Sequence, residues 1–387
     1  PLGAELKFNI KQTWWDAVVK ERDDVVGLSA AIIMNPKVWV ASGHVSGFSD
    51  PLVECKKCRK RFRADETETQ KCPECGGELI KARNFNLMFK TFVGPVEGTA
   101  SVAYLRPETA AGIFMNFKNV VDTMRVKMPF GIAQIGRAFR NEINPKDYVF
   151  RTREFEQMEL EYFVKPGDDE RAFKEWIDKR TTWYEKLGLK NIRKQEQSPE
   201  ERAHYSKGTV DIEYEFPFGW KEIEGIANRS DFDLKSHSEH SGQDLSYTDK
   251  ETGEKYLPYV IEPSAGVDRI CLAFLCDAYT EEDKRVVLKL HPKLAPYKAA
   301  VFPLVANKPE LVEKARQIFK ELKATGLNIA WDDRGNIGKR YYSQDEIGTP
   351  YCITADYQTL EDGTVTIRDR DTAKQERISE REISGHL

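Results

Sequence analysis

Two Cys-x-x-Cys pairs, Cys55 with Cys58 and Cys72 with Cys75, constrain this chain more tightly than any other short feature. Thirteen residues separate the pairs. Each pair can direct two thiolates at one tetrahedral zinc ion, and two such pairs close a four-cysteine site. Paired disulfides are the alternative that the spacing disfavours. Because four thiolates leave no open coordination position, the pattern predicts a structural zinc rather than a catalytic one.

The other three cysteines, Cys271, Cys276 and Cys352, stand among apolar residues, where cysteine is usually a small buried hydrophobe. Nothing in the pattern indicates a secreted disulfide framework, so we expect a cytoplasmic protein. The formal net charge is −4, and any nucleic-acid partner would therefore need a local basic patch. No run of about 18 apolar residues occurs, which argues against a membrane partner.

A local basic patch exists around the first cysteine pair. It comprises Lys56, Lys57, Arg59, Lys60, Arg61 and Arg63. These side chains could contact RNA phosphate. A solvated face is the alternative, and the sequence alone favours it.

Hydrophobic spacing predicts the first elements of the fold. Residues 1–22 carry an apolar stripe typical of a helix, formed by Leu6, Ile10, Trp14 and Val18. Pro36 is expected to open a short extended run over 37–41, in which Val38 and Val40 alternate with the other residues. A second helix is predicted over 169–187, with Gly188 as its C-terminal cap.

A change of composition near 294–297 predicts a second domain, since 387 residues allow two or three. It is expected to begin with a strand over 298–302, followed by a helix from Pro309 to Gly326. Further strands are predicted over 329–331, 351–355 and 364–368. Strand–helix–strand alternation of this kind indicates a small α/β unit.

Two predicted strands carry charged residues. On the first, residues 132–142, alternation would place Arg140 and Glu142 on one face. On the second, residues 155–164, the apolar face holds Met158, Leu160, Tyr162 and Val164, and the opposite face holds Phe155, Gln157, Glu159 and Glu161. The two glutamates would lie ~7 Å apart. For this strand alone a water-exposed face is favoured, and a polar floor beneath a substrate is the alternative.

The segment 259–269 is expected to contain a strand that Glu262-Pro-Ser-Ala-Gly266 breaks, followed by a buried helix. Arg269 at that helix start could meet a phosphate or an aromatic ring. His237 and His240 are expected in a polar loop, where solvent exposure is favoured over metal binding. The other histidines, His44, His204, His291 and His386, show no ligand spacing, and no nucleophile–base pair is evident.

In this order the segments resemble the catalytic domain of a class II aminoacyl-tRNA synthetase. Their residue sequences are similar to those of glycyl-tRNA synthetases of the homodimeric type. The resemblance covers nearly the whole chain and depends on the number and order of the matching segments. They are residues 2–7 with Trp14 and Trp15, Ser42-Gly-His44, and residues 86–89, 104–110, 131–136, 139–142, 153–159, 224–229 and 262–266.

The resemblance implies an α+β fold: an antiparallel sheet of about six strands flanked by helices. It implies a homodimer, with residues 5–22 and Pro36 in the interface, and some tens of residues before Pro1. The implied domains are a first catalytic part (1–54), a zinc-ribbon insertion (55–83), a second catalytic part (84–296) and an α/β anticodon-binding domain (297–387).

The resemblance also implies contacts to ATP and to the magnesium that accompanies it. Arg140 would hold the α-phosphate and Arg269 would cover one face of adenine, so both would be catalytic. The remaining contacts would come from Asn141 in the same turn, Glu142 at the adenine amino group, Arg151 at the terminal phosphates, Phe155 on the ring, and Glu222, the Ile223 backbone and Glu262 for ATP and magnesium.

For glycine, the implied contacts are Glu108, Glu159 and Ser264, with Glu161 and Glu262 close by and Arg63 as a further contact. The glycine carboxylate would attack the α-phosphorus to give glycyl-adenylate and pyrophosphate. A ribose hydroxyl of the tRNA would then take the glycyl group. Such a reaction needs positioning and charge stabilisation more than a protein nucleophile.

Three alternatives remain open at this point. A class II synthetase for proline, serine or threonine is disfavoured by Glu159, Glu161 and the Arg-Pro-Glu-Thr-Ala stretch. A non-catalytic relative should have lost ATP-binding charges, whereas Arg140, Glu142 and Arg269 are all present. A zinc-ribbon protein with an unrelated core is disfavoured because the cysteine segment is a small part of the chain.

Overall fold

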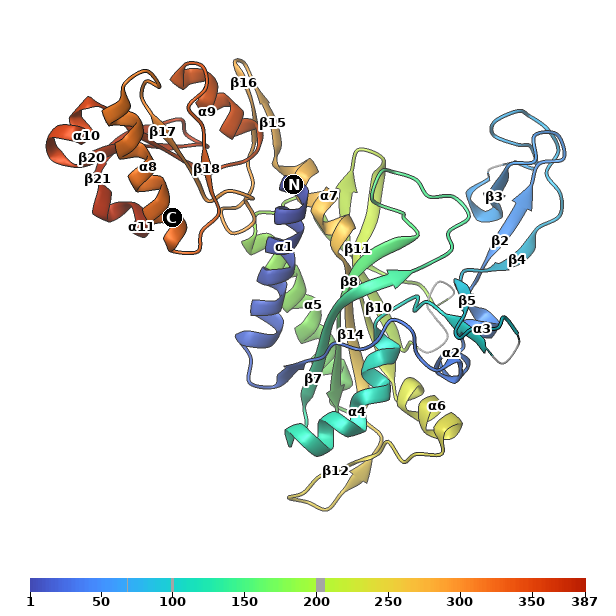
Figure 1. Cartoon of the computed structure of the whole chain (residues 1–387). Coiled ribbons are helices and arrows are strands. Elements are labelled where there is room, and N and C mark those ends of the chain that lie inside the picture. Colours follow the sequence, from blue (N-terminus) through green and yellow to red (C-terminus); the bar gives the residue numbers. More distant parts are fainter. Residues whose placement is uncertain (68, 99–100, 200–205) are drawn as a thin grey trace.

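The centre of the computed structural model, which describes residues 1–67, 69–98, 101–199 and 206–387, is a seven-stranded sheet (Figure 1). Its order is β1 (Val25–Gly27), β7 (Phe130–Phe139), β8 (Glu154–Val164), β14 (Tyr259–Gly266), β11 (Gly219–Ser230), β10 (Gly208–Phe216) and β9 (Ile192–Glu196). β1 pairs parallel with β7, and the other neighbours are antiparallel. The sheet confirms the α+β class. His204 lies outside the described residues.

Helices cover both faces of this sheet. One face carries α1 (Leu2–Trp15), which continues through a π turn (Asp16–Lys20), with α5 (Asp169–Lys186) and α7 (Val267–Ala278). The other carries α4 (Ala110–Met124) and α6 (Phe232–Ser241). The helices predicted over 1–22 and 169–187 are thus confirmed within a few residues.

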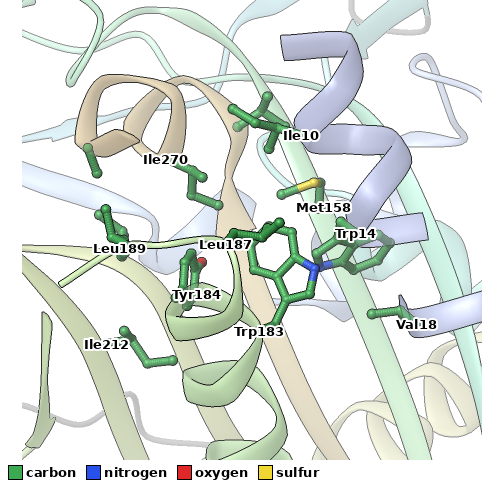
Figure 2. Packing of buried hydrophobic residues seen from close by; sticks show 14 of the residues in the cluster. Ile10, Trp14, Val18, Met158, Trp183, Tyr184, Leu187, Leu189, Ile212 and Ile270 are labelled. Carbon is green, nitrogen blue, oxygen red and sulfur yellow. The ribbon is translucent and has the colours of Figure 1, made fainter. Parts of the chain in front are cut away.

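The largest hydrophobic core lies between β8 and the helices α1, α5 and α7. Figure 2 shows Trp14 of α1 and Trp183 of α5 beside Met158 of β8. The Trp183 indole also donates a hydrogen bond of 3.3 Å to the Thr13 carbonyl. Met158, Leu160, Tyr162 and Val164 all belong to this core, so the predicted apolar face of β8 is confirmed.

A buried ion pair joins α5 to β11 through the same core. The Arg180 guanidinium donates to both Glu224 oxygens, at 2.7 and 3.2 Å, and the Tyr184 hydroxyl donates to Glu224 at 2.6 Å. Arg180 is 2% exposed and Glu224 is fully buried. Burial of two opposite charges is tolerated only with such complete hydrogen bonding.

The cysteine pairs lie in a small unit built on a three-stranded sheet. Its order is β3 (Arg61–Arg63), β2 (Ser49–Glu54) and β4 (Arg83–Asn86), with antiparallel pairing throughout. In the view of Figure 1 it projects from the central sheet on the side away from the C-terminus. The hairpin of β5 (Lys90–Phe92) and β6 (Val102–Tyr104) follows it in the chain.

The C-terminal part is a five-stranded sheet in the order β18 (Ile329–Trp331), β17 (Ala299–Pro303), β19 (Tyr351–Ala355), β20 (Thr364–Asp369) and β21 (Gln375–Ser379). Its helices are α8 (Pro309–Ala324), α9 (Ile337–Glu346), α10 (Tyr357–Asp362) and α11 (Ile383–His386). The parallel β17, β18 and β19 with the connecting α8 and α9 confirm the predicted strand–helix–strand alternation.

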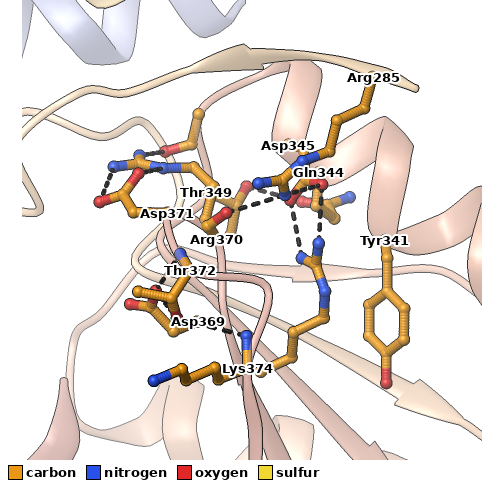
Figure 3. A network of polar contacts seen from close by, with 12 residues as sticks. Arg285, Tyr341, Gln344, Asp345, Thr349, Asp369, Arg370, Asp371, Thr372 and Lys374 are labelled. Carbon is orange, nitrogen blue, oxygen red and sulfur yellow. Dashed lines mark hydrogen bonds and ion pairs between the residues drawn. The ribbon is translucent and has the colours of Figure 1, made fainter. Parts of the chain in front are cut away.

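A hairpin of β15 (Tyr279–Glu282) and β16 (Arg285–Leu288) connects α7 to this unit. Figure 3 shows Arg285 reaching the fully buried Asp345 of α9, at 2.8 Å. Arg368 of β20 donates two hydrogen bonds, of 2.8 and 2.9 Å, to the same carboxylate. Although the hairpin precedes the predicted boundary at 297, its Arg285 contacts the C-terminal unit through Asp345 and the Arg370 carbonyl.

The predicted extended run at Pro36 is wrong, because residues 36–41 form the helix α2 (Pro36–Ala41). The Asn35 side chain accepts a hydrogen bond of 3.0 Å from the Lys37 N–H, and Pro36 occupies the first helical turn. This pairing of an N-cap residue with proline outweighs the strand preference of Val38 and Val40. Trp39 is fully buried as a result. The short helix α3 (His44–Gly47) follows.

Two predictions about strand ends are also wrong. β7 ends at Phe139, so Arg140 and Glu142 do not alternate along a strand. Conversely, β14 runs through Pro263 to Gly266 without a break. Pro263 is tolerated because the pairing of β14 with β8 is interrupted at Glu262 and Pro263.

The predicted loop at His237 and His240 is helix α6, and His237 is only 7% exposed. Solvent exposure is therefore wrong for His237, because its helix packs against α4. A last hairpin, β12 (Tyr247–Thr248) with β13 (Lys255–Tyr256), follows α6 in the chain.

Replacement of Glu224 by alanine should lower the free energy of unfolding by about 3–5 kcal/mol, because it leaves the Arg180 charge buried and unpaired. Urea denaturation followed by tryptophan fluorescence would measure the change. The control is Glu215→Ala, since Glu215 is exposed on the adjacent strand β10. A loss for Glu224→Ala no greater than the control would show that the pair adds nothing to stability.

Candidate active site

A cavity of about 410 Å³ opens over β8, β10, β11 and β14, at the start of α7. Its volume suits a small-molecule ligand. Eleven of the candidate site residues line it: Glu108, Arg140, Glu142, Arg151, Phe155, Glu159, Glu222, Ile223, Glu262, Ser264 and Arg269. Asn141, Glu161 and Arg63 are not among its lining residues. Segments from distant parts of the chain thus converge on one space.

Three arginines, Arg140, Arg151 and Arg269, lie in one part of the cavity together with Glu142 and Glu222; this part is called the cationic end. Arg140 follows directly after β7, and its Nε donates to the Pro107 carbonyl at 3.1 Å. Its guanidinium lies 5.3 Å from the centre of the Phe155 ring. Arg269, from the first turn of α7, lies 4.3 Å from the Phe150 ring centre. Arg269 also donates to the Glu222 carboxylate at 3.1 Å, so packing and charge both orient it.

Arg151 reaches this end from a narrow loop that returns the chain towards β8. Reciprocal backbone hydrogen bonds with Lys146, of 3.1 and 3.2 Å, close the loop. Glu66, which follows β3, accepts hydrogen bonds from Arg151 at 2.5 Å and from Lys146 at 2.8 Å. The cysteine-bearing unit therefore contacts the cavity wall through Glu66.

Glu142 is a buried acceptor at the same end. Its side chain is 8% exposed, and its Oε2 has no hydrogen-bond partner among the described residues. Burial raises the pKa of Glu142, although Arg151 and Arg140 oppose the shift. The neighbouring Asn141 donates its backbone N–H to the Leu87 carbonyl at 2.8 Å, which fixes the turn.

The other end of the cavity is acidic. Glu159 of β8 is 2% exposed and accepts hydrogen bonds from the Thr109 N–H at 2.9 Å and from the Thr109 hydroxyl. Its second oxygen accepts from Ser264 at 2.8 Å and from Gln157 at 3.3 Å. Burial and the nearby Glu108 raise the pKa of Glu159.

Two further carboxyl groups lie beside Glu159. Oxygens of Glu159, Glu161 and Glu262 fall within 4.8 Å of one another. Glu262 accepts from Arg229 at 2.6 Å, and burial still raises the pKa of Glu262 to about 8. Glu161 is fully buried, and neither of its oxygens has a hydrogen-bond partner in the described chain. Burial and the adjacent Glu262 raise the pKa of Glu161 well above its ordinary value.

Glu108 differs from its acidic neighbours. Burial alone would raise the pKa of Glu108, but His44, followed by Arg229 and Arg140, lowers it to about 2. His44 Nε2 lies 3.3 Å from Glu108 Oε2. At neutral pH, Glu108 is therefore the carboxyl of this acidic end most firmly held as an anion.

Comparison with known proteins gives two family models and a set of close relatives. The tRNA synthetase class II core domain (G, H, P, S and T) matches residues 97–278, and the anticodon binding domain matches 298–387. A glycine–tRNA ligase of Alkaliphilus oremlandii is 52% identical over 423 residues, covering 100% of this chain and 91% of the relative. Those of Clostridium acetobutylicum and Thermobifida fusca are 53% and 52% identical, each over all of this chain and 91% or 90% of theirs.

The chain belongs to the glycine–tRNA ligase family. The family membership and the two matched domains agree with the fold, in which the C-terminal sheet begins at Ala299. None of the described helices is long and apolar enough to cross a membrane.

Several polar residues of the cavity were not singled out as ligands by the sequence. Arg229 of β11 holds Asp233 with bonds of 2.7 and 2.8 Å as well as Glu262. Asp211 of β10 lies on the wall, and burial and Glu222 raise the pKa of Asp211 to about 6. Arg229 ends one of the segments shared with the family, a signal that could have found it, whereas nothing in the sequence marked Asp211.

Arg63 is oriented by acids outside the cavity. It donates to Asp50 at 2.6 Å and to both Asp65 oxygens, at 3.1 and 2.8 Å. These pairs saturate much of its guanidinium, so a contact from Arg63 to a ligand would require at least one of them to open.

The four cysteines fit a zinc ion. Cys55 Sγ lies 3.5 Å from Cys75 Sγ, and Cys58 Sγ lies 3.6 Å from Cys72 Sγ. All four sulfurs fall within 4.8 Å of one another. A tetrahedral zinc with Zn–S bonds of about 2.3 Å separates its sulfurs by about 3.8 Å. The residues could therefore hold a metal with little rearrangement.

Purified protein should contain about one zinc ion per chain, because four converging thiolates bind zinc tightly. Elemental analysis measures the content. Cys72→Ser should lose most of the zinc, whereas Cys276→Ser, on α7 far along the chain, should keep it. Metal-free parent protein, or disulfides among the four cysteines, would contradict the prediction.

Proposed function

We propose that this chain activates glycine with ATP to glycyl-adenylate and then transfers the glycyl group to the 3' end of tRNA. The observation that carries the proposal is the polarity of the cavity. Arginines suited to a triphosphate lie at one end, with Glu142 and Glu222 beside them, and buried carboxyl groups suited to an ammonium lie at the other, with Arg229 beside them. A relative that is 52% identical over the whole chain is named glycine–tRNA ligase, which fits a site for ATP and glycine.

At the cationic end, Arg140, Arg151 and Arg269 would bind and orient the phosphates and the base. Guanidinium groups suit this task because they remain charged and offer several donors in a fixed plane. Phe155 supplies an aromatic face beside Arg140. Glu142 supplies an acceptor without a described partner, which matches the donor character of an adenine amino group.

Magnesium would enter with ATP and neutralise part of its phosphate charge. Hard carboxylate oxygens suit this ion. Of the two acids suggested by the resemblance, Glu222 offers an oxygen towards Asp211, since both acids lie beside Gly225 on the cavity wall. Glu262 is engaged by Arg229 and is the less available ligand.

At the acidic end, the ammonium of glycine would meet Glu108 and Glu159. The attacking carboxylate would then point towards the α-phosphate near Arg140. Holding the two reactants in line supplies much of the rate enhancement, and the arginine stabilises charge that develops at phosphorus. No protein nucleophile is required by this scheme.

The resemblance supports further parts of the proposal. The bound metal is zinc with a structural role, and the protein acts as a homodimer in the cytoplasm. The unit from about residue 297 onwards, which the anticodon-binding model matches, contacts the tRNA. Arg63 and Glu161 would act at the edge of the glycine site rather than on its wall.

Among the twenty amino acids, glycine alone should support strong ATP–pyrophosphate exchange, and Arg140→Ala should abolish it. Loss of a charge-assisted phosphate contact costs ~2–4 kcal/mol or more in the transition state. Arg137→Ala is the matched control, since Arg137 lies on β7 just before Arg140 and pairs with the exposed Glu154. Exchange by Arg140→Ala within a few-fold of the parent would refute the role of Arg140. Exchange driven by another amino acid would refute the substrate.

Glu159→Gln should strongly impair the use of glycine and change ATP binding little, because glycine offers only its ammonium and carboxylate for recognition. Alanine should be rejected by steric overlap in a close-packed pocket rather than by editing. Steady-state exchange kinetics with varied glycine, alanine and ATP measure these effects.

Glu154→Gln is the matched control for Glu159→Gln. Glu154 is exposed at the start of the same strand β8 and pairs with Arg137 outside the cavity. An unchanged KM for glycine in Glu159→Gln, or comparable charging of alanine by the parent, would contradict the pocket assignment. A large loss in Glu161→Gln alone would move the glycine contact to that residue.

A further inference from the structure

His44 is a largely buried histidine that does not line the cavity but contacts Glu108 at its acidic end. It begins α3, and its Nε2 lies 3.3 Å from Glu108 Oε2. Its Nδ1 lies 2.8 Å from the Ser42 hydroxyl. Only 14% of each of the His44 and Glu108 side chains is exposed. A chain of three side chains therefore leads from Ser42 to the carboxyl group.

The contacts of the ring determine which nitrogen carries the proton. When the Ser42 hydroxyl donates to Nδ1, the proton of the neutral ring resides on Nε2 and is directed at Glu108. A protonated ring would direct an N–H at Glu108 as well. With the proton on Nε2, or with both nitrogens protonated, His44 therefore presents an N–H to this carboxylate across 3.3 Å.

The surrounding structure holds the His44 ring in place. Its ring centre lies 5.8 Å from Trp39 and 5.0 Å from Phe48. Gly43 has φ of +79°, a conformation that glycine adopts at little cost and that turns the chain into α3. The Asn86 side chain donates to the His44 and Val45 carbonyls at 3.0 and 3.1 Å, which ties the turn to β4.

Glu108 needs such a partner because it faces both signs of charge. The cations are Arg229 and Arg140, and the nearby acids include Glu159 and Glu262. His237 and Asp233 of α6 also stand in this neighbourhood. Clustered buried acids favour protonation of some members, and a protonated acid is a poor partner for an ammonium. A hydrogen-bond donor held next to Glu108 favours ionisation of Glu108 over that of the neighbouring acids.

We propose that His44 is a positioning residue for the amino-acid substrate: its Nε2–H fixes the ionised carboxylate of Glu108 that receives the substrate ammonium. The inference rests on the proposed function and deepens it by adding a residue that does not itself line the cavity. Of the three arginines proposed to bind ATP, only Arg140 also acts on Glu108. Replacement of His44 should therefore affect the use of glycine much more than that of ATP.

Two substitutions separate the donor of His44 from its packing. His44→Phe keeps an aromatic ring beside Trp39 and Phe48 but removes the N–H. His44→Gln keeps an N–H donor and loses the ring. His240→Phe is the matched control, because His240 is an exposed residue of α6.

In ATP–pyrophosphate exchange, His44→Phe should raise the KM for glycine about ten-fold or more, the size of effect expected for one hydrogen bond to a charged group. The KM for ATP should stay within about two-fold. His44→Gln should recover much of the loss, and His240→Phe should match the parent.

The pH dependence gives a readout that a purely structural role would not move. Without the donor the pKa of Glu108 rises, so its ionised fraction falls as the pH is lowered. As the pH is lowered, the KM for glycine in His44→Phe should therefore begin to rise at a higher pH than it does in the parent.

Equal increases in both KM values, or no difference between the phenylalanine and glutamine variants, would overturn the inference. If His44→Phe does not fold, Ser42→Ala tests the same chain of contacts, and it should raise the KM for glycine several-fold without changing that for ATP. A parent protein without glycine-dependent exchange would refute the proposed function itself. An active parent with an unaffected His44→Phe would refute only the role of His44.

Discussion

The site depends on keeping several carboxyl groups out of water beside a small number of cations. Oxygens of Glu159, Glu161 and Glu262 lie within 4.8 Å of one another. At the distances of this cluster, like charges in a poorly solvated space repel strongly, so full ionisation is not sustainable. Arg229 offsets part of this charge by binding Glu262 and Asp233 at once. The strands that carry these residues must therefore stay in fixed register.

The central sheet provides that register from its opposite, apolar side. β8 packs Met158, Leu160 and Tyr162 into the main core, which fixes where Gln157 and Glu159 emerge on the cavity side. On β11 the buried pair of Arg180 and Glu224 adds a directional contact to this packing. A hydrophobic core alone tolerates small shifts, whereas a bidentate ion pair specifies one geometry.

Alternation along β8 was readable from the sequence because its side chains keep a strict period of two. The same period gave a wrong prediction for Arg140 and Glu142, because the strand ends at Phe139. Both residues nevertheless line the cavity. The backbone N–H of Arg140 instead donates to the Arg153 carbonyl and that of Asn141 to the Leu87 carbonyl, contacts that no local pattern encodes. The burial of Glu161 was likewise invisible, since a single strand cannot reveal what covers its polar face. The resemblance supplied the site residues that periodicity alone could not.

In the cysteine-bearing unit, the basic residues around the first cysteine pair have two interpretations from the sequence: an RNA-contacting patch or a solvated face. Most of its basic side chains have an acidic partner: Lys56 with Glu78, Lys60 with Glu74, Arg59 and Arg61 with Glu54, and Arg63 with Asp50. This pairing favours a solvated, charge-balanced face over a strongly cationic one. Exposed pairs contribute only about 0–1 kcal/mol each, so they are too weak to fix the unit in place. Its contacts with the rest of the chain include Glu66, which accepts from Arg151, and Asn86 of β4, which donates to the backbone at His44. The same asparagine thus connects the unit to the residue that faces Glu108.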